Sequence, residues 1–78
     1  MYHSLIDNVL RENEMIAMLR KGWTVKINGD SYVVLGSRQL RRIQLYILNG
    51  PNGRISIRRQ DFLSWQQPGS NVAVQVTA

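Results

Sequence analysis

The stretch that decides the fold runs from Arg41 to Arg59 and reads RRIQLYILNGPNGRISIRR. Apolar and polar residues alternate on both sides of the central NGPNG segment, which is typical of two β-strands joined by a turn. The stretch holds five of the ten basic residues of the chain and no acidic residue. It therefore contains two strands of the predicted sheet and half of the basic residues of the chain.

The alternation predicts which side chains of these two strands face the core. The predicted core residues share one parity and are Ile43, Leu45, Ile47, Ile55 and Ile57. A five-residue loop at 49–53 pairs Ile47 with Ile55 across the hairpin. The same register places Tyr46 on the solvent side, among arginines.

Similar patterns place the other elements. Residues of about 4–21 have apolar side chains at helical spacing, with Ser4 as a cap, and predict a helix. Asn28-Gly29 favours a type I′ turn, and residues 37–40 suggest a loop or bulge that carries Arg38. Strands are predicted at about 23–28, 31–36, 41–49, 54–59 and 72–76, with a short helical turn at about 61–65.

This order of elements resembles that of SH3-like small barrels, in which a 3₁₀ turn lies between the fourth and fifth strands. With the leading helix it is also similar to the Sm-like arrangement, over Ser4 to Val76. Residues 58–62 read RRQDF, where the Sm family has an Arg-Gly or Lys-His pair, so no binding residue is carried over.

The expected fold class is therefore α+β in a single domain, 1–78. An N-terminal helix packs on a strongly bent antiparallel sheet, or on a small SH3-like barrel, of four to five strands. An open meander packed on the helix fits the same pattern.

Composition indicates the cellular compartment and the source of the protein. The 78 residues include no cysteine, which leaves neither a disulfide framework nor a zinc-thiolate site and fits a reducing compartment. No apolar run is long enough to span a bilayer, and the N-terminus lacks a basic segment followed by an apolar one. We expect a soluble, cytoplasmic protein without a membrane partner, and its small size favours a bacterium, phage or plasmid as the source.

The net charge of +5 is concentrated in the middle of the chain. Residues 22–65 hold seven basic and two acidic side chains, and no charged residue follows Trp65. Six of the seven bases are arginine, whose planar guanidinium matches phosphate and stacks on flat rings. This segment indicates an anionic partner.

The candidate partner is a nucleic acid, DNA or RNA. The candidate binding residues are Lys26, Arg38, Arg41, Arg42, Tyr46, Arg54, Arg58 and Arg59. The arginines would contact phosphates, and Tyr46 would stack on a base. The solvated face of an antiparallel sheet is polar in any case, but such a face usually mixes the two signs of charge.

Catalysis has little support in the sequence. His3 is the only histidine, the serines have no evident base, and NGPNG lacks the lysine of a phosphate-binding loop. We therefore expect no enzyme activity, no cofactor, no metal and no small-molecule substrate.

An alternative function is a protein-interaction module. The Val72–Val76 strand or the N-terminal helix would then form a homodimer, or dock the chain as an inhibitor or adaptor subunit on an acidic protein.

Overall fold

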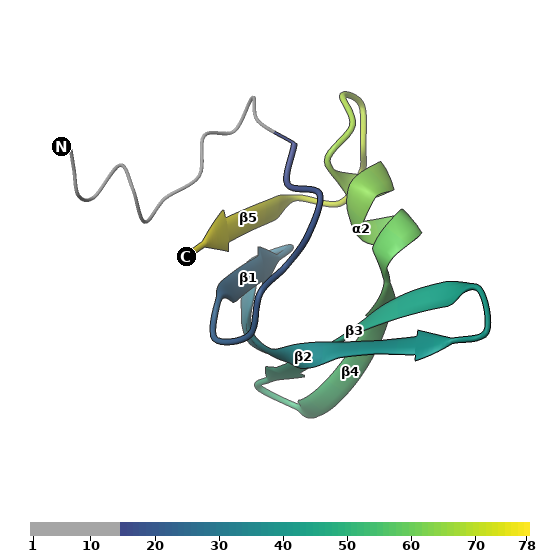
Figure 1. Ribbon diagram of the computed structural model, residues 1–78. Helices are drawn as coiled ribbons and strands as arrows, with labels where there is room; N and C mark the ends of the chain where they lie inside the picture. Colours follow the sequence, from purple (N-terminus) through teal and green to yellow (C-terminus); the bar gives the residue numbers. More distant parts are fainter. Residues whose placement is uncertain (1–14) are drawn as a thin grey trace, which may run out of the picture.

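A computed structural model describes residues 15–78, which form one five-stranded antiparallel sheet and one short helix (Figure 1). The elements are β1 (Thr24–Ile27), β2 (Asp30–Leu40), β3 (Ile43–Gly50), β4 (Gly53–Arg58), α2 (Arg59–Trp65) and β5 (Val74–Thr77). The strand order is β4-β3-β2-β1-β5. Strands β4 and β5 are therefore the two edges, and β5 pairs with β1 of its own chain.

The predicted fold class needs correction, because the described part of the chain is mostly sheet. The helix expected at about 4–21 is wrong for residues 15–21, which are not helical, and its part at 4–14 lies outside the described residues. The side-chain amide of Gln66 explains this difference. It accepts a hydrogen bond from the Ile16 amide N–H at 2.7 Å and donates one to the Ile16 carbonyl at 2.9 Å. Tertiary hydrogen bonds thus occupy backbone groups that a helix would pair internally.

The barrel alternative is also wrong, since the sheet of residues 15–78 is open between β4 and β5. The antiparallel sheet itself is confirmed, as is the short helix before the last strand. The Asn28-Gly29 turn has positive φ at both residues, 49° and 93°, as the type I′ turn requires.

Strand β2 is longer than predicted. A bulge between Val34 and Gly36 shifts the register, and pairing with β3 then continues to Leu40. Arg38 therefore lies within a strand, where a loop or bulge was expected.

The β3–β4 hairpin has a tighter turn than predicted. Gly50 pairs with Gly53, which leaves only Pro51 and Asn52 in the turn. Proline suits the second position of a type I turn and glycine the fourth, and Gly53 has φ +108°. The predicted five-residue loop is wrong, and the register moves by one residue, so that Ile47 faces Ser56.

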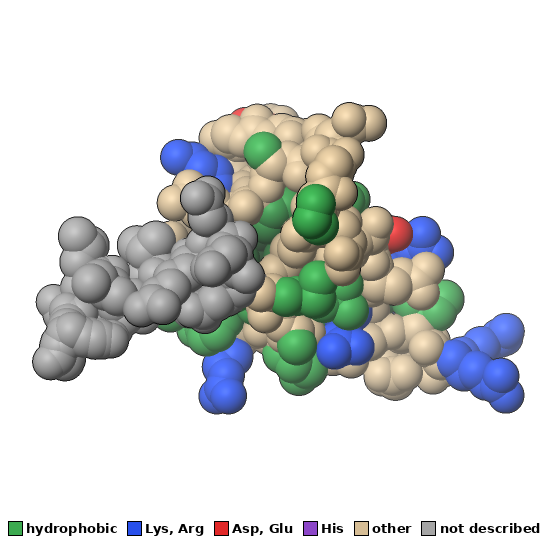
Figure 2. Space-filling model, turned by 90° about the horizontal axis from the view of Figure 1, so that it is seen from above, with side chains coloured by type: hydrophobic (Ala, Val, Ile, Leu, Met, Phe, Trp, Pro, Cys, Tyr) green, Lys and Arg blue, Asp and Glu red, His purple; other side chains and the backbone are tan. Residues whose placement is uncertain are grey.

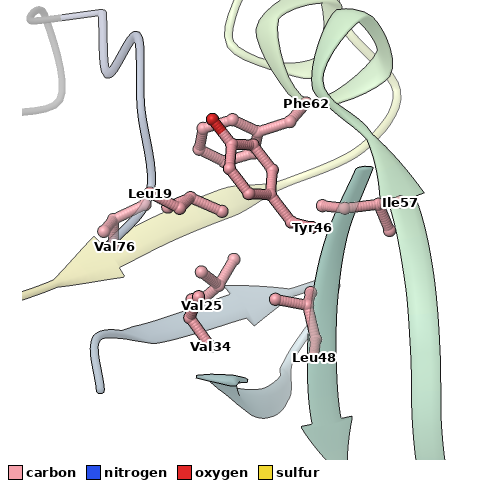
Figure 3. Close-up of a cluster of buried hydrophobic side chains, with 8 residues drawn as sticks. All are labelled: Leu19, Val25, Val34, Tyr46, Leu48, Ile57, Phe62 and Val76. Carbon is pink, nitrogen blue, oxygen red and sulfur yellow. The ribbon is translucent and has the colours of Figure 1, made fainter. Parts of the chain in front are cut away.

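The core face of β3 is the opposite of the predicted one. Tyr46 and Leu48 are fully buried, whereas Ile43 is 44% exposed and Leu45 and Ile47 are half-buried. The ring of Tyr46 packs edge-to-face on Phe62 of α2, with centroids 6.1 Å apart and an interplanar angle of 86° (Figure 3). On β4 the parity was right for Ile57, which is buried, although Ile55 remains 37% exposed.

The core draws on every element of the described chain (Figure 3). Its members are Leu19, Val25, Val34, Tyr46, Leu48, Ile57, Phe62 and Val76. Trp23 and Trp65 pack against its rim. Within residues 15–78, no helix is long and apolar enough to cross a membrane.

Replacing Tyr46 by phenylalanine tests the cost of its buried hydroxyl, which has no hydrogen-bond partner among the described residues. A buried polar group without a partner is destabilising. Tyr46→Phe should therefore leave the free energy of unfolding in urea unchanged or raise it. Phe62→Ala, which removes the ring that Tyr46 contacts, should lower it by about 3–5 kcal/mol. A clear loss of stability in Tyr46→Phe would contradict this account.

Candidate nucleic-acid interface

The end of the β2–β3 hairpin is an exposed part of the sheet. Strand β1 pairs with β2 only at residues 30–33, and β4 pairs with β3 only from Leu45 onward. Residues 39–44, called the arm below, therefore extend as a two-stranded ribbon beyond the neighbouring strands (Figure 1). Its turn consists of Arg41 and Arg42, and both side chains are exposed.

A hydrogen bond within the arm stabilises its turn. Arg41 adopts φ +54°, a left-handed conformation that is unfavourable for a residue with a side chain. The Gln39 amide Nε2 donates a hydrogen bond to the Arg41 carbonyl at 3.0 Å. A side chain of the arm thus fixes the backbone that presents the two arginines.

The face of the sheet that points away from the core, called the outer face below, carries further arginines. Arg38 and Arg58 flank Leu45 in one row across β2, β3 and β4. Arg54 lies on the same side of β4, opposite Asn49. All three arginines are exposed, as predicted.

Two of the predicted basic residues already have partners. Arg58 forms a two-pronged ion pair with Asp61 of α2, with nitrogen–oxygen distances of 2.8 and 3.1 Å. The hydrogen bond and the charge of Asp61 raise the pKa of Arg58 above its usual value. Arg59 is half-buried at the start of α2 and donates from Nε to the Ala17 carbonyl at 2.9 Å.

Two of the predicted binding residues, Lys26 and Tyr46, do not lie beside the exposed arginines of the arm and of β4. Lys26 is exposed and points outward, but it lies on β1, with Ser31 of β2 and Gln75 of β5 as its cross-strand neighbours. Ser31 lies near the start of β2, whereas the arm holds the end of that strand. Tyr46 is fully buried against Phe62, so the prediction that it stacks on a base is wrong.

The arm also exposes apolar side chains. Leu40 and Ile43 face each other across the two strands and are 47% and 44% exposed. Figure 2 shows basic side chains at the end of the molecule to which the arm extends, with apolar side chains nearby. The arm therefore combines positive charge with accessible apolar surface.

A hollow of about 200 Å³ lies between the arm and the start of α2. It is lined by Gln39, Arg42, Ile43, Gln44, Arg59 and Gln60. None of these six residues is acidic. The three glutamines were not among the predicted binding residues. Residues 39–44 read QLRRIQ, a nearly palindromic pattern about a two-residue turn, and this pattern could have indicated the cross-strand pair of Gln39 and Gln44.

Comparisons with protein-family models, curated proteins and solved structures found no match to this chain. Residues 15–78 contain no group of three or more histidine, cysteine or carboxylate side chains placed to hold a metal ion.

Glycine substitution at the two turn residues tests the backbone of the arm. Arg41→Gly relieves a left-handed conformation, and this gain of about 1 kcal/mol offsets the flexibility that glycine adds. Arg42 does not have a positive φ, so Arg42→Gly should lower the free energy of unfolding by about 0.5–1 kcal/mol. Both variants lose one positive charge, which makes them a matched pair for urea unfolding. Greater destabilisation by Arg41→Gly than by Arg42→Gly would contradict the assignment.

Proposed function

We propose that this protein is a small nucleic-acid-binding accessory or regulatory protein, which contacts phosphates through its arm and outer face. One observation supports this proposal above the others. Residues 15–78 contain nine of the ten basic side chains of the chain and only two of its five acidic ones. Of these two, Asp61 is paired with Arg58, and Asp30 begins β2 next to the β1–β2 turn. The arm and the row through Leu45 thus have a large excess of positive charge.

The geometry of the basic residues fits a polyanion. Arg38, Arg41, Arg42 and Arg54 are all exposed, and each guanidinium can donate two parallel hydrogen bonds to one phosphate. A two-stranded ribbon such as the arm is narrow enough for the major groove of a duplex. With Tyr46 buried, any stacking on bases would use guanidinium planes. The protein acts in the cytoplasm of a bacterium, on the nucleic acid of the bacterium itself, of a phage or of a plasmid.

A protein-interaction function is the second candidate, favoured by the open edges of the sheet. Strand β4 is one edge, and Ile55 on it is 37% exposed. An exposed edge can add a strand from another copy of the chain. Light scattering coupled to size-exclusion chromatography separates the two functions. A stable dimer together with no binding to nucleic acid would favour the second.

Removing two arginines of the proposed surface should weaken binding to nucleic acid of every sequence. Arg38→Ala combined with Arg54→Ala should lower the affinity for a labelled duplex by about tenfold or more at low salt. The slope of log K against log salt should fall by about 2, because two phosphate contacts are lost. Fluorescence anisotropy across a salt series measures both quantities.

The matched control is Arg20→Ala combined with Lys21→Ala, which removes the same charge from exposed residues before β1. This variant should retain most of the affinity. Equal losses in the two double variants would show that only net charge matters. Wild-type binding that is insensitive to salt would remove the proposal.

Neutralising Asp61 should strengthen binding. Asp61→Asn removes the negative charge that is held against Arg58, so the affinity should rise and the salt slope should become steeper. The ion pair is exposed, and its loss should change the urea midpoint little. Asp30→Asn provides the control, since Asp30 lies at the β1–β2 turn, away from the arm. A gain for Asp30→Asn as large as that for Asp61→Asn would contradict a specific role for Arg58.

A further inference from the structure

The hollow between the arm and α2 differs in chemistry from the outer face. Three of its six lining residues are glutamines, two are arginines, and Ile43 supplies apolar surface. An amide presents a donor and an acceptor side by side, which matches the polar edge of a nucleobase. Phosphate binding alone would need only the arginines.

The side chains that line the hollow are partly oriented in advance. Gln39 donates from Nε2 to the Arg41 carbonyl, which leaves its Oε1 as an acceptor. Arg59 donates from Nε to the Ala17 carbonyl, and its two terminal nitrogens donate to no other residue of the described part of the chain. Gln44 is half-buried directly opposite Gln39. A site whose groups are already fixed loses less entropy when a ligand binds.

The charge of the hollow favours an anionic ligand. Arg42 and Arg59 approach it from the arm and from α2, and no carboxylate of residues 15–78 lines it. Arg59 is half-buried, so its guanidinium has lost part of its hydration and gains from an anionic partner. A nucleotide combines the two required parts, a phosphate for the arginines and a base edge for the amides.

We propose that this hollow binds one unpaired nucleotide of a single-stranded DNA or RNA. The inference rests on the proposed function and extends it to the form of the nucleic acid. The base enters between the amides of Gln44 and Gln60, and Arg42 and Arg59 bind the adjoining phosphate. Bases within a duplex have paired edges and remain stacked, so they cannot enter such a hollow.

The test compares single-stranded and duplex probes with variants that change one amide. Gln44→Leu preserves the volume and removes the hydrogen-bonding groups, and Gln60→Ala changes an exposed lining residue if Gln44→Leu does not fold. The probes are labelled oligothymidine, oligouridine and a blunt DNA duplex, measured by fluorescence anisotropy at one salt concentration. Both thymine and uracil offer donors and acceptors on their free edge, so the two single strands separate DNA from RNA.

The expected result is a loss of about tenfold or more in affinity for at least one single strand, with unchanged affinity for the duplex. Gln75→Leu, which alters an exposed glutamine of β5 outside the hollow, should change neither. Arg54→Ala, on the outer face, should weaken all probes alike. If Gln44→Leu and Gln60→Ala fold and leave single-strand affinity unchanged, or lower single-strand and duplex affinity equally, the hollow is not a base site and the proposed function stands. If the wild type binds none of the probes, the proposed function fails as well.

Discussion

The packing of Tyr46 against Phe62 determines the rest of this structure. Side chains of a strand alternate between its two faces, so burying Tyr46 and Leu48 turns Ile43, Leu45 and Ile47 outward together. A ring in the centre of the core also holds α2 on the sheet, because Phe62 is the one residue of that helix that is fully buried. One aromatic contact thus decides both the composition of the outer face and the position of the helix that borders the hollow.

The turn of the β3–β4 hairpin determines which residues of β3 lie opposite the arginines of β4. With Gly50 opposite Gly53, Arg58 comes to lie across from Leu45, in the row that ends at Arg38. Arg58 is also paired with Asp61, three residues further along in the first turn of α2, and this contact is local in sequence. Turn geometry and strand register are therefore coupled, because a shift of one residue in the turn would place a different β4 residue opposite Leu45.

Sequence patterns predicted the elements that depend on local chemistry. Four of the five strands follow from alternation, and the Asn28-Gly29 turn follows from residues that accept positive φ. The second strand is apolar on both faces and follows from its place directly after that turn. Arg54 and Arg58 were correctly placed on the exposed side because β4 has only one apolar parity. Strand β3 offers two, Ile43-Leu45-Ile47 and Tyr46-Leu48, and only contact with α2 selects between them. The helical spacing near residue 16 failed for a related reason, since the distant Gln66 takes the backbone groups of Ile16.

The arm shows where the fold gives up stability. Leu40 and Ile43 remain 47% and 44% exposed, although a ribbon that served only to close the β2–β3 hairpin could end at Leu45 and bury more of its surface. A chain of 78 residues has little stability to lose. Residues 39–44 contribute two cross-strand pairs and a two-residue turn, with Arg41 in a left-handed conformation, and they add to that cost. Natural sequences break the local rules of folding mainly at functional sites. The arm breaks several of them at once, and it also holds the arginines and amides that could recognise a nucleotide.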